Sequence, residues 1–151
     1  MTTVISVFNQ SGGTGKTSVS LNLGYELSQL NYRVLLIDFD PQASLTLFLG
    51  DEPVDLEKEQ TIYTSLMDEA PLPIRHSHNL DWVPSNIFLS QAEIELVSAD
   101  MRDFRLKEAL EPIKEEYDLI LIDCPPSLGI LSYLALVSSS HVVVTVMPEF
   151  K

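Results

Sequence analysis

A short run of glycines between an apolar segment and an amphipathic segment limits the fold of this chain more than any other feature. Residues 3–8 are apolar and mostly β-branched, which is typical of a buried strand. After the glycines, apolar residues recur at Val19, Leu23, Leu27 and Leu30, the spacing of one helix face. This order places the turn at a helix N-terminus, where backbone N–H groups can bind an anion.

The turn itself has the residue types of a phosphate-binding loop. Residues 10–18 read QSGGTGKTS. In such loops the lysine reaches the β- and γ-phosphates and the next hydroxyl binds Mg²⁺, roles that fall here to Lys16 and Thr17. The strict pattern G-x-x-x-x-G-K-[ST] fails at one position, because Gln10 stands in place of its first glycine. The alternative is a glycine-rich turn with an incidental lysine.

Two further apolar runs end in carboxylates. Residues 34–37 lead into Asp38 and Asp40, and residues 119–122 lead into Asp123. Continuous apolar runs are typical of central parallel strands that are covered on both faces. Ligands of open α/β sheets bind at the carboxyl ends of the strands, where an acid can hold Mg²⁺ through water or orient an attacking water. A single such acid is often only a turn former, but three strand ends together predict a nucleotide site.

Three motifs resemble those of the ParA/MinD family of deviant Walker-motif ATPases. The family loop K-G-G-x-G-K-T-[TS] is matched by SGGTGKTS at residues 11–18. The motif D-x-D-P-Q is matched at residues 38–42, and D-x-P-P-S at residues 123–127. The resemblance covers nearly the whole chain and implies an α/β P-loop NTPase fold, a three-layer parallel sheet with helices on both faces, in one domain over residues 1–151.

The resemblance also implies ATP and Mg²⁺ as cofactors and assigns roles to single residues. The cofactor-binding residues would be Gly12, Gly13, Thr14, Gly15, Lys16, Thr17 and Ser18. Asp40 would orient the attacking water, while Asp38 and Asp123 would support the metal bound by Thr17. Residues 125–126 would begin the second switch segment.

Ser11 departs from the family pattern, which has a lysine at this position. In the family that lysine reaches the partner subunit's nucleotide across a sandwich dimer, and a comparable arginine finger is worth ~10³–10⁵ in rate. Three alternatives follow: weak hydrolysis, a non-hydrolysing switch, or another cation in place of the lysine. A serine here resembles the carboxysome-positioning branch of the family, the McdA type, which favours the third alternative.

Few cations are available as a replacement, because the chain has only nine Lys and Arg. Arg33 precedes a strand, at the sheet edge away from the nucleotide. The basic residues between 102 and 114 fall in a helical stretch, where a solvated face is their expected role. Lys151 follows the apolar run 141–147, which we expect to be a fifth parallel strand, and so belongs to the ligand edge. We therefore predict that Lys151 supplies the missing charge, in cis or in trans; the alternative is an ordinary surface lysine. The predicted catalytic residues are Lys16, Asp40 and Lys151.

The chain is acidic, with 9 basic and 22 acidic residues and a net charge of −13. The resemblance implies an ATP-dependent homodimer, non-specific DNA binding and an adaptor similar to ParB or McdB. DNA binding needs clustered Lys and Arg, and the basic residues at 102–107 are interleaved with acids. We therefore expect DNA binding by this portion to be weak or absent, and the chain to be the N-terminal part of a longer fold. A natural half-length chain is the alternative.

Other features bear on location and on the remaining segments. The single cysteine, Cys124, excludes an intramolecular disulfide and fits a cytoplasmic chain. Association with the nucleoid is implied by the family resemblance. The sequence has no apolar run of about 20 residues, the length that a transmembrane helix needs. We therefore expect no membrane partner. Residues 50–80 form a connection with one short helix near 63–67, with His76 and His78 as loop residues; a short strand follows at 80–84, and residues 89–116 form a helix in two pieces.

The leading functional hypothesis is a ParA-type positioning ATPase with carboxysomes as the favoured cargo. Partition of plasmids or chromosomes is the alternative cargo. A non-hydrolysing ATP-binding switch module and a metabolic enzyme of the same fold are the alternative functions, although D-x-D-P-Q at residues 38–42 argues against the enzyme.

Overall fold

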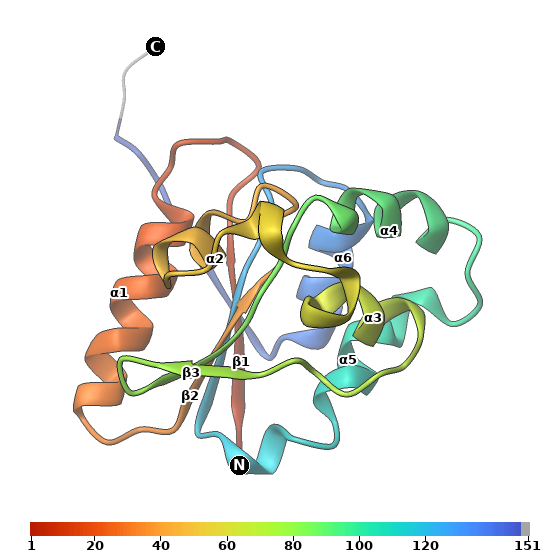
Figure 1. Cartoon of the computed structure of the whole chain (residues 1–151). Helices are drawn as coiled ribbons and strands as arrows, with labels where there is room; N and C mark the ends of the chain where they lie inside the picture. The colour runs from red at the N-terminus through yellow and green to blue at the C-terminus, as the bar shows by residue number, and fades with distance from the viewer. Residues whose placement is uncertain (149–151) are drawn as a thin grey trace.

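The computed structural model describes residues 1–148 and has a six-stranded sheet at its centre (Figure 1). The strand order is β3-β4-β2-β5-β1-β6; β3 is antiparallel to β4 and every other pairing is parallel. The strands are β1 Thr3–Phe8, β2 Val34–Asp38, β3 Arg75–Ser77, β4 Leu80–Val83, β5 Leu119–Asp123 and β6 His141–Val144. The α-helices are α1 Lys16–Gln29, α2 Ser44–Phe48, α3 Ile62–Met67, α4 Phe88–Leu96, α5 Arg105–Leu110 and α6 Ile130–Ser138. Short 3-10 helices lie at η1 Pro53–Asp55, η2 Lys58–Gln60, η3 Arg102–Phe104 and η4 Lys114–Glu116.

Helices cover both faces of the sheet, which confirms the three-layer fold expected from the motifs. Side chains alternate along each strand, so Leu35 and Ile37 pack in one apolar cluster while Leu36 packs in the other. The first cluster lies under α3, α4, α5 and α6, and the second lies under α1 and α2 (Figure 1). The central strands β2 and β5 are buried on both faces, which explains their continuous apolar runs.

The strand β3 was missed by the sequence reasoning, which assigned His76 to a loop. Its three residues are polar or charged and pair antiparallel with β4, through a turn in which His78 and Asn79 have positive φ. A strand this short has too few residues to show an alternating pattern, and only its pairing with β4 defines it. The last parallel strand is present as expected, but it ends at Val144 instead of residue 147.

The helical predictions are confirmed in outline. A short helix, α3, lies at the expected place, and the stretch 89–116 contains α4 and α5 with 3-10 turns between and after them. None of the helices within residues 1–148 is long and apolar enough to cross a membrane.

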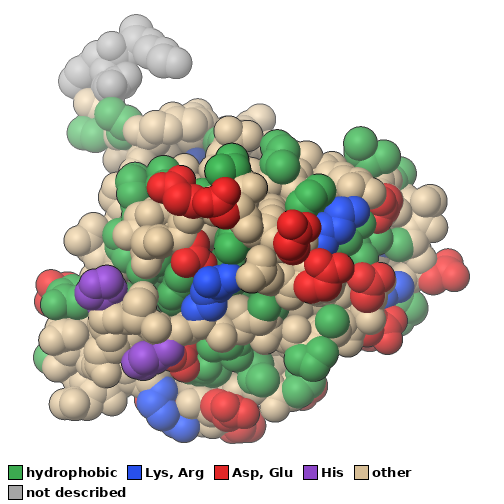
Figure 2. Space-filling model, viewed as in Figure 1, with side chains coloured by type: hydrophobic (Ala, Val, Ile, Leu, Met, Phe, Trp, Pro, Cys, Tyr) green, Lys and Arg blue, Asp and Glu red, His purple; other side chains and the backbone are tan. Residues whose placement is uncertain are grey.

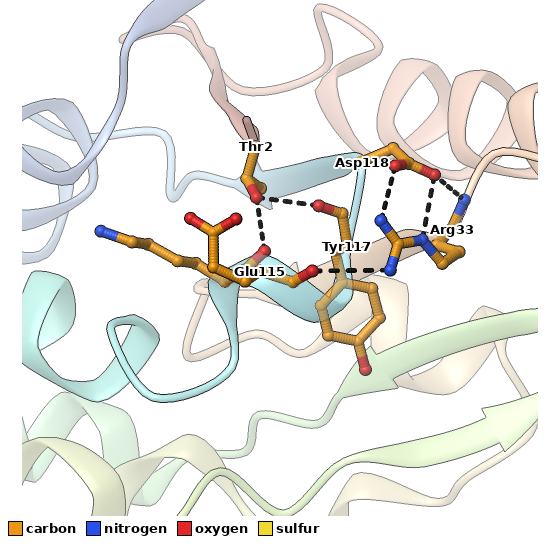
Figure 3. A network of polar contacts seen from close by, with 6 residues as sticks. Thr2, Arg33, Glu115, Tyr117 and Asp118 are labelled. Atoms are coloured by element: carbon orange, nitrogen blue, oxygen red, sulfur yellow. Dashed lines mark hydrogen bonds and ion pairs between the residues drawn. The ribbon is translucent and has the colours of Figure 1, made fainter.

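A polar network ties the amino ends of β2 and β5 together (Figure 3). The backbone N of Arg33 donates to Asp118 Oδ2 at 2.8 Å, and its guanidinium donates to both carboxylate oxygens, at 3.2 Å (Nε) and 2.8 Å (NH2). These hydrogen bonds and the positive charge lower the pKa of Asp118 to about 2. Thr2 Oγ1 donates to the carbonyl of Tyr117 at 2.8 Å. The network confirms that Arg33 lies at the edge of the sheet opposite the glycine loop.

Candidate functional site

The glycine loop joins β1 to α1 and borders open space. Gly13 and Gly15 have φ of 71° and 84°, a backbone conformation that residues with a side chain rarely adopt. A Cβ built on Gly12, Gly13 or Gly15 would meet no atom within 4 Å. The first turn of α1 has no side-chain cap and no acidic residue, so its N–H groups remain available to an anion. The loop therefore has the shape and the donors of a phosphate cradle.

Lys16 lies at the centre of this cradle although it is only 7% exposed. Its Nζ donates to the carbonyl of Ser11 at 2.9 Å, across the loop. The same carbonyl accepts a hydrogen bond from Thr14 Oγ1 at 3.3 Å. Burial and this contact hold the ammonium group over the loop, where a phosphate group would be attracted by it.

Thr17 and Asp123 meet beneath the loop, as the motifs predicted. Thr17 Oγ1 donates to Asp123 Oδ2 at 2.7 Å, and Ser20 Oγ donates to Asp123 Oδ1 at 2.9 Å. The two hydroxyls therefore connect α1 to the end of β5. The sequence reasoning missed Ser20; its signal was the spacing of three residues from Thr17, which puts both hydroxyls on one helix face.

Asp38 is fully buried and its described hydrogen bonds go to the protein itself. Its Oδ2 accepts from the backbone N and the Oγ1 of Thr46, at 2.8 and 2.7 Å, and its Oδ1 accepts from the N of Asp40 at 3.2 Å. The carboxylate thereby anchors α2 and the turn that carries Asp40. Asp38 is paired with Asp123 on the neighbouring strand. The expected role of Asp38 beside the metal stays a prediction.

Asp40 lies in a turn that several hydrogen bonds hold in place. Its Oδ1 accepts from the N of Gln42 at 2.9 Å, and its carbonyl accepts from Ser85 Oγ at 2.9 Å. The N of Ser85 in turn donates to Thr46 Oγ1 at 2.9 Å. The sequence reasoning missed Thr46 and Ser85, because single hydroxyl residues outside a motif give no sequence signal.

Burial raises the pKa of each of these carboxyl groups. The pKa of Asp38 rises to about 7 and that of Asp123 to about 6, and a neighbouring negative charge adds to both shifts. The pKa of Asp40 is also raised by burial, while the positive charge of Lys16 opposes the shift. Three acids crowded at one strand edge favour a cation there.

The donor set fits Mg²⁺ held together with a nucleotide. Within residues 1–148 no group of three or more His, Cys, Asp or Glu side chains could hold a metal ion by itself. Mg²⁺ usually binds through one or two protein oxygens, several waters and the substrate phosphates. Thr17 Oγ1 with Asp123 behind it is such a partial site.

The pKa shifts predict that stability without nucleotide and Mg²⁺ is highest at about pH 4. For Asp38 and Asp123, whose folded pKa is raised, the contribution is complete below about pH 4 and is lost as the pH rises through about 6 and 7. For Asp118, whose folded pKa is lowered, the contribution is present above about pH 4 and is lost as the pH falls through about 2. Thermal unfolding followed by circular dichroism from about pH 3 to 8 measures this. The Asp118→Asn variant should lose only the acid-side decline, and an unchanged Tm between pH 5 and pH 8 would contradict the prediction.

The end of the last strand contacts the glycine loop from the side (Figure 1). Asn9 Oδ1 accepts from the N of Ser11 at 2.7 Å, and Asn9 Nδ2 donates to the carbonyl of Thr145 at 2.5 Å. Thr145 Oγ1 donates to Thr14 Oγ1 at 2.9 Å. The sequence reasoning missed Asn9 and Thr145 as loop supports. Lys151, predicted to act here, lies outside the described residues.

Two further residues singled out in the sequence lie near the loop and the end of β5. Ser18 is exposed on the first turn of α1, and its carbonyl accepts from Asn22 Nδ2 at 2.7 Å. Cys124 is buried behind the strand end, which agrees with its interpretation as a small packing residue.

Comparisons with known proteins agree with this geometry. The family model described as AAA domain matches residues 2–151. The sporulation initiation inhibitor protein Soj of Bacillus subtilis is 47% identical, over 97% of this chain and 59% of its own length. A cobyrinic acid a,c-diamide synthase from Mycobacterium smegmatis, solved with ADP and magnesium, has a TM-score of 0.92 and 36% identity over 97% of this chain and 60% of its own. Apo McdA from Cyanothece has a TM-score of 0.87 and 31% identity over 96% of this chain and 58% of its own.

These matches bear on the cofactors and on the length of the chain. The bound ADP and magnesium of the mycobacterial structure agree with the ATP and Mg²⁺ predicted from the motifs. The chain spans about three-fifths of the length of each of these three relatives.

Proposed function

The chain belongs to the ParA/MinD-like branch of the AAA domain family, and from this premise we propose that it binds and hydrolyses ATP as part of a positioning or partition protein. The observation that carries the proposal is the meeting of Lys16, Thr17 and Asp123 at an open glycine loop. In this function ATP drives homodimerisation on nucleoid DNA, and an adaptor of the ParB or McdB type stimulates hydrolysis and release.

Each residue of the site has a part in this chemistry. The N–H groups of Gly12, Gly13, Thr14 and Gly15, with the Lys16 ammonium, hold the β- and γ-phosphates, and Ser18 holds the α-phosphate. Thr17 binds Mg²⁺, with Asp123 and Asp38 supporting it, and the bound ion neutralises charge on the phosphates. Asp40 orients the attacking water, since its turn is fixed by Gln42 and Ser85.

ATP turnover measured with and without double-stranded DNA and adaptor tests the proposal. Mg²⁺-dependent turnover that rises with the adaptor supports it, and no ATP binding by a folded chain would overturn it. ATP binding without turnover would instead support the non-hydrolysing switch module. The similarity to the mycobacterial synthase favours one further candidate, an ATP-dependent amide-forming enzyme. That candidate predicts turnover only when cobyrinic acid or a similar small acid is added.

The cargo follows from Ser11 in this proposal. The serine in place of the second lysine supports carboxysomes over plasmids or chromosomes. DNA binding by residues 1–151, whose net charge is −13, is weak or absent. Purified carboxysomes or supercoiled plasmid, each tested for co-sedimentation with the ATP-bound protein and its adaptor, distinguish the two cargoes.

Lys151 is proposed to replace the missing lysine. Among the described residues the other cations have partners elsewhere: Arg33, Arg75, Arg102, Arg105 and Lys114 form ion pairs, and Lys58 lies 4.4 Å from the Tyr63 ring centroid. Lys107 is exposed on α5. None of these contacts involves the glycine loop.

The Lys151→Ala variant is expected to lose about 10²- to 10³-fold in ATP turnover, because a cation facing the γ-phosphate stabilises charge in the transition state. Steady-state phosphate release measures the effect. Lys114→Ala, which removes a lysine from the opposite end of the sheet, is the matched control and should be unchanged. ATP affinity and turnover that both stay at the original level in Lys151→Ala would contradict the assignment.

A further inference from the structure

A cavity of about 710 Å³ lies on the α3 and α5 side of the sheet, and no residue of the glycine loop lines it. It is formed by the end of α3, the segment that follows α3, the loop before η3, and α5. Figure 1 places α3 and α5 away from α1 and α2. Its volume is within the range of small-ligand sites, so it can accommodate a few side chains of a partner.

The floor of the cavity is apolar. Leu72 is buried, while Ile113 and Ala109 are partly buried against the core below α5. Met101 stands at the rim and is 65% exposed. Methionine is flexible and polarisable, so it adapts to the shape of a partner side chain. An exposed methionine over an apolar floor favours an occupant with at least one apolar side chain.

The rim of the cavity is acidic. Glu69, Asp100 and Glu108 line it together with one cation, Arg105. Arg105 NH1 lies 2.9 Å from Glu69 Oε1, so that pair is neutral. Within residues 1–148, Asp100 and Glu108 take part in no ion pair. Figure 2 shows acidic side chains gathered over the α3 region of this face. The cavity therefore has a net negative rim on a chain whose net charge is −13.

The charges decide between classes of occupant. An anion would meet the carboxylates of Asp100 and Glu108, while the guanidinium of Arg105 is only 19% exposed and already paired. The cavity residues form no group of carboxylates able to hold a metal ion. A positively charged peptide matches the rim, and an apolar side chain of the same peptide matches the floor.

We propose that this cavity is a docking site for a basic peptide segment with an apolar anchor, in which lysine or arginine contacts Asp100 and Glu108. The assignment of this peptide to the adaptor rests on the proposed function. The chemistry of the site is independent of that function. The helix α5 also packs against α6, which follows the motif at residues 123–127. An occupant on α5 is therefore one helix away from the nucleotide site.

Fluorescence anisotropy with a fluorescein-labelled peptide of alternating lysine and leucine tests the proposal on the 151-residue chain. The double variant Asp100→Asn, Glu108→Gln should weaken binding by about tenfold, from about 0.7 kcal/mol for each exposed charge contact. The matched control, Glu52→Gln with Asp55→Asn, removes the same charge from exposed residues near η1 and should change binding by less than about twofold. A second peptide, with glutamate in place of lysine, should not bind.

Four results would overturn the site. They are equal weakening in the control variant, binding of the glutamate peptide, no binding of the lysine peptide, and concentration-dependent self-association that is lost in the Asp100, Glu108 variant. The last result would assign the cavity to a second copy of the chain. ATP binding measured on the same samples separates the two proposals: a chain that binds ATP but not the peptide contradicts only the docking site, and the reverse contradicts only the proposed function.

Discussion

Lys16→Ala is expected to lower ATP affinity by about 10²- to 10³-fold, because it removes a buried charge partner of the phosphates worth roughly 3–4 kcal/mol. Lys16 is the cation that the structure places at the glycine loop, and its Nζ is held there by the Ser11 carbonyl at 2.9 Å. The variant also leaves Asp40 and Asp123 without the positive charge that opposes their raised pKa values. The loss of the Lys16 charge weakens the attraction of the site for a polyanionic ligand.

Titration with a fluorescent ATP analogue in the presence of Mg²⁺ measures this effect. The Lys16→Arg variant should restore little, because a planar guanidinium does not replace a compact ammonium in a buried position. Lys114→Ala is the control for general loss of positive charge, since Lys114 pairs with Glu111 far from the loop. An ATP affinity for Lys16→Ala within about threefold of the unchanged protein would remove the phosphate-binding role.

Asp40→Asn is expected to lower ATP turnover by about 10²- to 10⁴-fold while ATP binding is retained, because an amide orients and activates water poorly. The substitution preserves the shape of the side chain, and the amide oxygen can still accept the hydrogen bond from the N of Gln42. The carbonyl of Asp40, which accepts from Ser85, is unaffected. The turn should therefore keep its structure, and the loss should appear in turnover alone.

Phosphate release and ATP binding are measured on the same preparation, so that the two effects separate. Asp55→Asn, which removes an exposed carboxylate from η1, is the matched control and should leave both unchanged. ATP affinity is expected to rise slightly in Asp40→Asn, because one negative charge near the phosphates is gone. If ATP turnover in Asp40→Asn persists at its original rate, another residue orients the attacking water.

That the candidate site residues lie close together was largely predictable, because a parallel sheet brings the carboxyl ends of its strands to one edge. Lys16 and Thr17 lie more than a hundred residues before Asp123, yet the glycine loop that holds them follows one apolar run and Asp123 ends another. Their meeting is confirmed by the hydrogen bond from Thr17 to Asp123 at 2.7 Å. The roles of all these residues in binding and chemistry, and those of Asp38, Asp40 and Lys151, stay predictions.

The residues that hold the site in place were not predictable. Ser20, Thr46, Ser85 and Thr145 are hydroxyl residues whose partners lie elsewhere in the chain. Serine and threonine occur throughout the sequence, and apart from the spacing of Ser20 from Thr17 nothing in their local pattern distinguishes a support from a solvated side chain. Their contribution depends on strand order, which places β5 between β1 and β2 although it comes much later in the chain.

By itself the sequence determined the parallel strands, the glycine loop and the acids, because hydrophobic period and glycine conformation are local properties of a few neighbouring residues. Only the tertiary structure decided three things: that Asp38 is anchored by Thr46, that the end of β6 contacts the loop through Asn9, and that α3 and α5 enclose an acidic cavity. Each depends on the distance between segments far apart in the chain, which is set by how the two faces of the sheet pack.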